Sequence, residues 1–212
     1  MSPLDLTDSG EPMDCNIDAA TLCIGNKANI GETDSKGWTV LIYYARLDGN
    51  TTQTAQFLAQ EGLDVNQCDN DGWTPLHHAI AIGNTKVCQL LVEKGADVNL
   101  ANSLGETALM FCAKHSNLEA ATLLIESGAD VNQENRVGWT PLTYCARYCD
   151  SAQIAKLLIY HWAKVNQPDC LGWPPLTHCA LAGGKLVAEA LVCNGAGITP
   201  RQRAVTPIDK PL

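Results

Sequence analysis

Apolar residues recur along this chain in short patterns that are typical of amphipathic helices. Leu76, Ala79 and Ile80 fall at positions i, i+3 and i+4, so they would share one face of a helix. A second apolar set that includes Val87 and Leu91 follows after a polar interval with the same kind of spacing. The pattern therefore predicts a pair of short helices, each of which buries one face.

Local signals mark where these two helices begin and end. Thr74 is a favourable N-cap residue, and Pro75 suits the first helical position because its missing N–H is not needed there. The dipeptide Gly83-Asn84 predicts a turn between the helices. Gly95 ends the second helix in the left-handed conformation that glycine adopts most cheaply.

The same arrangement recurs at an almost constant interval. The tetrapeptide Gly-Trp-Thr-Pro or a near copy of it begins at Gly37, Gly72, Gly105, Gly138 and Gly172, at intervals of 35, 33, 33 and 34 residues. A fixed period in this range indicates one small unit that has been copied and stacked. Such an architecture favours a binding role over catalysis.

One copy of the repeat carries a resemblance to a known family. Residues 71–79 read Asp-Gly-Trp-Thr-Pro-Leu-His-His-Ala, and residues 90–99 read Leu-Leu-Val-Glu-Lys-Gly-Ala-Asp-Val-Asn. This unit resembles the ankyrin repeat, and the resemblance covers roughly residues 17–199. It implies an all-α solenoid, in which stacked antiparallel helix pairs are joined by β-hairpin-like loops.

The repeats predict three parts along the chain. Residues 1–15 are an acidic flexible arm, residues 16–200 form the ankyrin-repeat domain, and residues 201–212 are a tail. Within the domain we expect a half repeat at 16–33 and full repeats that start near 34, 69, 102, 135 and 169. The tail contains Thr206-Pro207-Ile208, which looks like the start of a sixth repeat. Either the tail folds back as a cap or the chain was cut from a longer protein.

Three repeats depart from the common pattern. Extra residues are expected between the helices of the first and fourth repeats, near 48–50 and 148–150. Trp162 stands where the other repeats have a helix-ending glycine, and a bulky residue is strained at positive φ. We therefore predict that the fourth repeat ends its second helix differently. Pro174 replaces the capping threonine of the fifth repeat, which loses a cap worth about 1 kcal/mol.

Charge and hydropathy exclude several kinds of partner. The formal net charge of −9 disfavours nucleic acid, which requires a dense basic patch, and it disfavours anionic membrane surfaces. No apolar run approaches the length of about 18 residues that a transmembrane helix needs. We expect a monomer in the cytoplasm, with the nucleus as the alternative location.

The ten cysteines favour a reducing compartment. Cys112, Cys145 and Cys179 occupy one equivalent position in three repeats, where the second repeat has Ala79. Stacked helices lie about 8–10 Å apart, whereas the Cα atoms of a disulfide lie within about 7 Å. We therefore predict small, reduced core residues and an intracellular protein.

The sequence carries no recognisable catalytic motif. It contains no HExxH, GxSxG or dinucleotide-binding fingerprint, and Gly184-Lys185 lacks the upstream glycine of a phosphate loop. We expect no enzyme activity and no cofactor. Cys145 and Cys149, four residues apart, could share a helix face near His178 and Cys179, which leaves a zinc-binding or redox-sensing protein as a third hypothesis.

The resemblance implies that a partner is held on the concave side, by loop tips and the first helix of each repeat. Read onto this chain, the expected partner-binding residues are Trp38, Arg46, Trp73, Ile82, Glu106, Lys114, His115, Trp139, Arg147, Tyr148 and Trp173. Four tryptophans form one row that Glu106 interrupts, and three basic residues share another position. Trp, Tyr and Arg dominate binding hot spots, so this surface suits a partner segment with acidic and apolar residues. The alternatives are that the tryptophans only pack over the hairpins and that the basic row is solvated surface.

The resemblance also gives roles to polar residues near the hairpins. His77 is expected to bond loop backbone. Asn66, Asn99, Asn132 and Asn166 each follow a leucine by eight residues, which resembles the pattern read by the asparaginyl hydroxylase that modifies ankyrin repeats. These asparagines also have a structural role, because they tie the hairpin.

Together these observations predict an intracellular protein–protein interaction module, a scaffold or adaptor that binds a protein on the concave face of an ankyrin solenoid. The alternative is a substrate-recognition or regulatory arm of a larger enzyme assembly, such as a ubiquitin-ligase adaptor or an ankyrin-type inhibitor.

Overall fold

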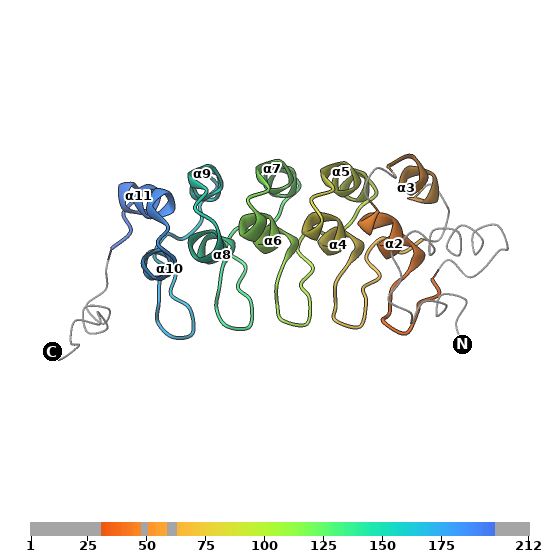
Figure 1. Cartoon of the computed structure of the whole chain (residues 1–212), viewed down its shortest axis with the longest axis horizontal. Coiled ribbons are helices and arrows are strands. Elements are labelled where there is room, and N and C mark those ends of the chain that lie inside the picture. Colours follow the sequence, from red (N-terminus) through yellow and green to blue (C-terminus); the bar gives the residue numbers. More distant parts are fainter. Residues whose placement is uncertain (1–30, 48–50, 59–62, 198–212) are drawn as a thin grey trace. The chain divides into compact units, whose positions relative to one another are not determined.

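The computed structural model describes residues 31–47, 51–58 and 63–197 (Figure 1). These residues form two compact units, which divide between Ala108 and Leu109. The described residues contain ten helices and no strand, so the predicted all-α class is confirmed. The acidic arm, nearly all of the half repeat, residues 48–50 and the tail after residue 200 lie outside the described residues.

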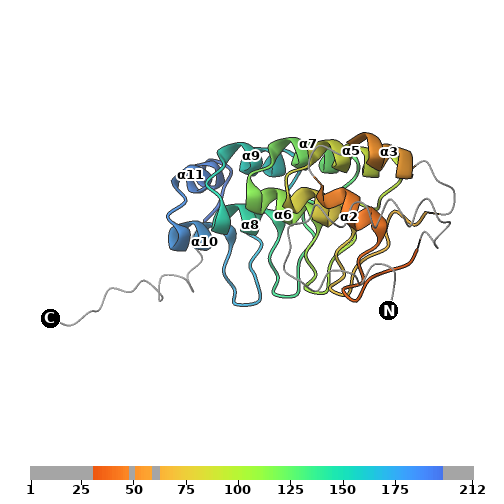
Figure 2. The same cartoon turned by 45° about the vertical axis from the view of Figure 1, so that its right-hand side comes forward.

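The described residues of the N-terminal unit form four helices that lie within it, in two layers. They are α2 (Val40–Arg46), α3 (Thr51–Leu58), α4 (Pro75–Ala81) and α5 (Thr85–Glu93). Helices α2 and α4 pack together beside the hairpin loops, and α3 packs with α5 on the far side (Figure 1). We call α2 and α4 the loop-side helices of this unit. The loops that lead into them project away from both helical layers (Figure 2).

The C-terminal unit repeats this arrangement. Its helices are α6 (Ala108–His115), α7 (Leu118–Glu126), α8 (Pro141–Tyr148), α9 (Ala152–Tyr160), α10 (Pro175–Ala182) and α11 (Lys185–Cys193), with only the first residue of α6 in the N-terminal unit. Helix α8 packs against α10 on the loop side, and α9 packs against α7 and α11 on the far side. Here the loop-side helices are α6, α8 and α10 (Figure 2).

The loop-side helices begin as the capping pattern predicts. Thr39, Thr74 and Thr140 each precede such a helix, and each hydroxyl accepts a hydrogen bond from the N–H three residues further on. Pro75 is the first residue of α4, as predicted. Pro174 caps α10 without any side-chain hydrogen bond, which confirms that the fifth repeat lacks this cap.

Small residues fill the equivalent core position on the loop-side helices. Ala79, Cys112, Cys145 and Cys179 are all at most 1% exposed. Neighbouring apolar positions such as Leu76 and Ile80 are also 1% exposed, as the helical spacing predicts. None of the eight described cysteines is in a disulfide, and the prediction that small residues fill this core position is confirmed.

The extra residue of the fourth repeat lies between its two helices, as predicted. Helix α8 ends at Tyr148 and α9 begins at Ala152, with Cys149 and Ser151 as their caps. The corresponding connection in the third repeat has only Ser116 and Asn117. The longer connection therefore leaves the packing of both helices in the fourth repeat intact.

The prediction for Trp162 is wrong, because the fourth repeat ends its second helix as the others do. Trp162 has φ 68°, close to the positive values at Gly95, Gly128 and Gly195. The N–H of Ala163 bonds the carbonyl oxygen of Leu158 at 2.9 Å, the same closing bond that follows Gly128. A Cβ atom at Gly128 would meet nothing within 4 Å, and the Trp162 side chain is 86% exposed. The bulky residue is therefore accommodated, and the strain is confined to its backbone.

We expect Trp162→Gly to raise the free energy of unfolding by about 1 kcal/mol, because a left-handed residue with a Cβ atom costs about 1–2 kcal/mol. Gly128→Trp should lower it by a similar amount, since space is available there as well. Urea unfolding followed by circular dichroism measures both changes. A loss of stability in Trp162→Gly would show that the indole makes a contribution that outweighs the backbone strain.

His77 joins helix α4 to the next hairpin loop. Its Nε2 atom lies 3.2 Å from the carbonyl oxygen of Glu106, and its Nδ1 atom lies 2.8 Å from Thr74 Oγ1. The carbonyl can only accept, so Nε2 carries the proton and Nδ1 accepts from Thr74. This confirms that His77 bonds loop backbone. Burial lowers the pKa of His77 to about 4, so the ring stays neutral in the folded protein.

Acid should therefore destabilise the fold. Between pH 6.5 and about 4 the unfolded chain protonates His77 and the folded chain does not, so the free energy of unfolding falls as pH falls. For His77 alone the loss is on the order of 2 kcal/mol at pH 5. Urea unfolding at pH 7 and pH 5 measures it. His77→Gln should lose this share of the pH dependence, and an unchanged dependence in that variant would contradict the assignment.

Candidate interaction surface

One Asp or Asn organises each hairpin loop. It stands three residues before the repeated glycine, at Asp34, Asp69, Asn102, Asn135 and Asp169. Its Oδ1 atom accepts two hydrogen bonds, from the backbone N–H groups two and four residues further on, at distances of 2.7–3.0 Å. The second of these N–H groups belongs to the residue after the glycine, which is tryptophan in four repeats. The loop residue therefore fixes the backbone that presents the tryptophan.

The other side-chain atom of the loop residue points to an aromatic position nine residues later, on the loop-side helix. That position holds Tyr43, His78, Phe111, Tyr144 and His178. Asp69 Oδ2 accepts from His78 Nε2 at 2.9 Å, and Asp34 and Asp169 pair with Tyr43 and His178 in the same way. The amide of Asn135 instead donates to the Tyr144 hydroxyl at 3.0 Å. Donor and acceptor are therefore matched repeat by repeat.

The third repeat lacks this loop-to-helix bond and satisfies its loop residue inside the loop. Its aromatic position is Phe111, whose ring offers no hydrogen-bonding atom to an amide. The amide of Asn102 donates to Glu106 Oε2 at 2.9 Å. Glu106, which interrupts the tryptophan row, therefore completes the loop of its own repeat. Part of this predicted partner-binding carboxylate is already engaged.

The tryptophans of the N-terminal unit pack around one histidine. The rings of Trp38 and Trp73 both lie 5.3 Å from the ring of His78, and Trp38 also meets Tyr43 at 5.2 Å. Both tryptophans are half-buried. Both indoles therefore pack against aromatic side chains of the loop-side helices, and each ring still exposes part of its surface.

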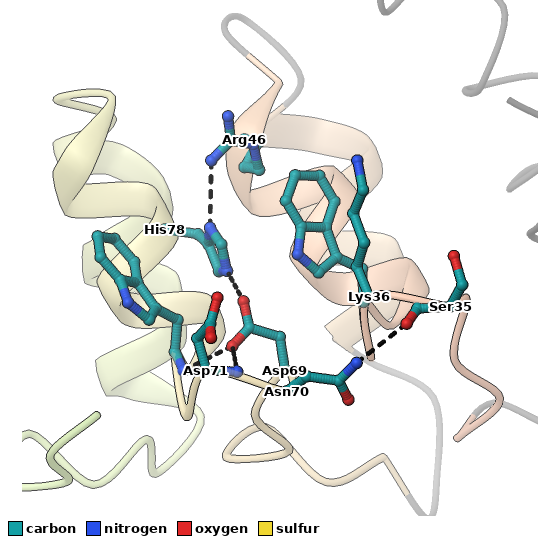
Figure 3. Close-up of a pocket in the computed structure, with 9 residues that line it drawn as sticks. Ser35, Lys36, Arg46, Asp69, Asn70, Asp71 and His78 are labelled. Carbon is teal, nitrogen blue, oxygen red and sulfur yellow. Dashed lines mark hydrogen bonds and ion pairs between the residues drawn. The ribbon is translucent and has the colours of Figure 1, made fainter. Parts of the chain in front are cut away.

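Trp38 and Trp73 border a cavity of about 530 Å³ in the N-terminal unit (Figure 3). It is lined by Ser35, Lys36, Trp38, Arg46, Asp69, Asn70, Asp71, Trp73 and His78. The Arg46 guanidinium lies 4.8 Å from the centre of the Trp38 ring, and the Lys36 ammonium lies 5.6 Å from it. Asp69 already bonds two backbone groups and His78, so its carboxylate is occupied.

Arg46 is a half-buried cation in this cavity. Its Nη1 atom lies 3.2 Å from His78 Nδ1, which accepts because His78 gives its Nε2 proton to Asp69. Burial lowers the pKa of His78, and the bond to Asp69 opposes that effect. The buried Nε of Arg46 has no hydrogen-bond partner among the described residues, and no described carboxylate lies within 4 Å of Arg46 or Lys36.

The C-terminal unit carries a similar arrangement around His178. The Trp139 ring lies 4.9 Å from the His178 ring, and Trp173 lies 6.0 Å from it. The indole N–H of Trp139 also donates to Asp169 Oδ2 at 3.1 Å. Burial lowers the pKa of His178, to which Asp169 is bonded. Each unit therefore contains a neutral histidine beside two half-buried tryptophans.

An aromatic and basic cluster extends this surface in the C-terminal unit. Tyr148 is 51% exposed, and its ring lies 5.9 Å from the Trp139 ring. The Lys114 ammonium lies 5.3 Å from the Tyr148 ring. Arg147, at the position equivalent to Arg46, is exposed and makes no bond to His178, whose buried Nδ1 has no partner among the described residues. This basic position is therefore half-buried in the first repeat and solvated in the fourth.

The structure brings together most of the predicted binding residues within each unit. Trp38, Arg46 and Trp73 share the cavity, and Lys114, Trp139 and Tyr148 form the contact series just described. Ile82, the C-cap of α4, is 39% exposed and does not line the cavity. His115, at the end of α6, is exposed.

Sequence reasoning missed the residues that hold the tryptophans. The signal was present, because all five repeats have Asp or Asn three residues before the glycine and an aromatic residue nine residues after that Asp or Asn. It was overlooked because the glycine and tryptophan dominate the repeated pattern. Lys36, one residue before Gly37, was likewise not among the predicted binding residues.

The hairpin asparagines do tie neighbouring loops. The Oδ1 atoms of Asn66, Asn132 and Asn166 accept from the N–H groups of Asp97, Lys164 and Gly197 at 2.8–3.1 Å. Their structural role is confirmed for these three repeats. Hydroxylation of Asn66, Asn99, Asn132 and Asn166 stays a prediction.

The described part of the chain contains neither a cluster of metal-ligating side chains nor a membrane-spanning helix. No group of three or more His, Cys, Asp or Glu side chains there is placed to hold a metal ion. None of the helices there is both long enough and apolar enough to span a membrane.

Comparison with known proteins identifies the family. A family model described as ankyrin repeats matches in three copies, at residues 13–102, 47–135 and 109–202. The chain is also similar to the SMC5-SMC6 complex localization factor protein 1 of Bos taurus and of Homo sapiens, with 41% identity over 59 residues in each case. The Mus musculus protein of that name is 38% identical over 60 residues. These matches cover 28% of this chain and only 6% of each relative. Because the three copies of the family model span most of its length, the chain belongs to the ankyrin-repeat family.

Proposed function

We propose that this protein binds an acidic and apolar segment of a partner protein on the surface formed by its hairpin loops and loop-side helices. Ankyrin repeats are generally protein–protein interaction modules. The observation that carries the finer proposal is Arg46, a half-buried cation that faces a tryptophan-lined cavity and has no described carboxylate within 4 Å. We place this interaction inside the cell and assign the protein no catalytic role.

The cavity of the N-terminal unit supports an acidic guest. A carboxylate near Arg46 and Lys36 would gain charge-assisted hydrogen bonds, which are about twice as strong as neutral ones. The Trp38 and Trp73 rings offer apolar surface to the carbon atoms of the same segment. A cationic guest would face two positive charges already placed against Trp38. Asp71, on the rim of the cavity, is exposed and suits the backbone N–H groups of a bound peptide.

The C-terminal unit supports a guest of the same chemistry. Lys114 and Arg147 supply positive charge, and Tyr148 and Trp139 supply aromatic surface. The tryptophans are held by packing and, for Trp139, by the bond to Asp169. Side chains that are already fixed lose little conformational freedom when a partner binds, so a few anchors can give useful affinity.

A peptide-display selection on the whole chain tests the proposal. We expect the recovered peptides to combine Asp or Glu with large apolar residues, and we expect Lys36→Glu to weaken their binding about tenfold, as for the loss of a charge pair worth about 1.4 kcal/mol. Lys86→Glu makes the same charge change on the far-side helix α5 and should leave binding within about twofold. Basic peptides, or equal losses in both variants, would contradict the proposal.

Exposed residues give the matching test in the C-terminal unit. Trp139 is unsuitable because its packing and its bond to Asp169 make its truncation a change in stability. Arg147→Glu combined with Tyr148→Ala should reduce binding of the selected peptides about tenfold while the thermal midpoint changes little, since both side chains are exposed. Lys156→Glu on the far-side helix α9 is the control. If the double variant still bound the selected peptides and Lys156→Glu did not, the binding surface would lie elsewhere.

A second candidate is a recognition or regulatory arm of a larger assembly. The similar proteins are named as localization factors of the SMC5-SMC6 complex, and the shared segment is 6% of their length. A ubiquitin-ligase adaptor or an ankyrin-type inhibitor would use the same surface. Size-exclusion chromatography of native lysate distinguishes this candidate, because elution at the mass of the isolated chain would contradict membership of a stable assembly.

A further inference from the structure

Two cysteines meet at the end of helix α8. Cys145 lies in the last turn and is buried, and Cys149 is the C-cap residue and is half-buried. Their Sγ atoms are 3.7 Å apart. We propose that Cys149 is an oxidation site for peroxides and that Cys145 is its resolving thiol, so that the two form a reversible disulfide. This proposal is independent of any partner.

The surroundings make Cys149 the nucleophile of the pair. The hydrogen bond from Cys145 lowers the pKa of Cys149 to about 6, and the Ser116 hydroxyl and the Ser151 N–H act in the same direction. Partial burial and the Asp150 carboxylate oppose this effect. The same pairing, together with burial, raises the pKa of Cys145. A thiolate that solvent can reach, next to a second thiol, is the arrangement of redox-sensitive cysteines.

The other described cysteines provide a comparison. Cys88 and Cys179 are buried, and burial raises the pKa of their thiols to about 12 and about 11. Cys68, Cys170 and Cys193 are exposed. Cys149 therefore differs from the buried thiols because solvent can reach its sulfur. It differs from the exposed thiols because a second thiol lies 3.7 Å from it.

The reaction balances with a peroxide as the only oxidant. The Cys149 thiolate attacks one peroxide oxygen, so an S–O bond forms, the O–O bond breaks, and the alkoxide or hydroxide leaves and takes up a proton. Cys149 is then a sulfenic acid, and the peroxide has been reduced by two electrons. Cys145 next attacks the Cys149 sulfur. The S–S bond forms, the S–O bond breaks, and the hydroxyl group leaves with the Cys145 proton as water.

The backbone can close the remaining distance. Side chains four residues apart on a helix have Cβ atoms about 5–6 Å apart, whereas a disulfide needs about 3.5–4.5 Å. Cys149 has φ −136° and ψ 143°, so it has already left the helical conformation. It belongs to the connection that carries the extra residue of the fourth repeat. The required movement therefore falls on that connection, immediately after the exposed Arg147 and Tyr148.

Treatment of the purified whole chain with hydrogen peroxide, followed by mass spectrometry, tests the proposal. We expect the loss of two hydrogen atoms and a peptide in which Cys145 and Cys149 are linked. Cys145→Ala, which introduces the residue that the second repeat has at Ala79, should instead leave a sulfenic acid on Cys149 that dimedone traps. A link between other cysteines, or unmodified Cys149 in both proteins, would overturn the proposal.

The pH dependence of alkylation gives a second measurement that needs no oxidant. The wild-type chain is compared with Cys145→Ala, which lacks the thiol that assists Cys149. Peptide mapping measures the alkylation of Cys149 in each protein. In wild type, Cys149 should react with iodoacetamide about tenfold faster than the exposed cysteines at pH 6, after allowance for its weaker intrinsic nucleophilicity. That advantage should shrink in Cys145→Ala. Equal rates at Cys149, Cys68, Cys170 and Cys193 in wild type would count against the assigned roles.

Discussion

The structure depends on one Asp or Asn in every hairpin loop. The Oδ1 atom of this residue accepts hydrogen bonds from two backbone N–H groups. That side chain satisfies two donors that a tight loop would otherwise leave to water, and in four of the five loops its second atom also bonds a residue of the loop-side helix. At Asp69 the carboxylate fixes the backbone of Trp73, orients His78 and thereby lets His78 accept from Arg46. Loop, helix and candidate site thus share one hydrogen-bond network, and a change at its centre would reach all three.

The sequence was sufficient for the helices and the core, because both follow from local and periodic signals. Thr74 and Pro75 place the start of α4, and the spacing of Leu76, Ala79 and Ile80 identifies its buried face. Trp162 shows where local reasoning stops. The steric rule correctly assigns a free-energy cost to a positive φ at a bulky residue. Whether the fold tolerates that cost depends on the open space around the residue, which cannot be read from a local sequence pattern.

The candidate site was only partly predictable, for a related reason. The rows of tryptophan and basic residues could be read from the repeat, but their burial depends on the next repeat along the chain. Arg46 is held by His78, which lies 32 residues away, whereas Arg147 at the equivalent position is solvated. The role of Glu106 could not be seen either, since it becomes apparent only when Asn102 and Phe111 are considered together.

The matching of donors and acceptors between loop and helix also bears on how such repeats can be exchanged during evolution or design. A crossover between residues 135 and 144 would separate Asn135 from Tyr144, and joining that loop to the helix of the third repeat would set its amide against Phe111, without the Glu106 carboxylate to accept from it. Exchange is therefore tolerated best when loop and loop-side helix are inherited as one block. The most favourable crossover points in this array are then the connections between the two helices of a repeat, and not the glycines that mark its period.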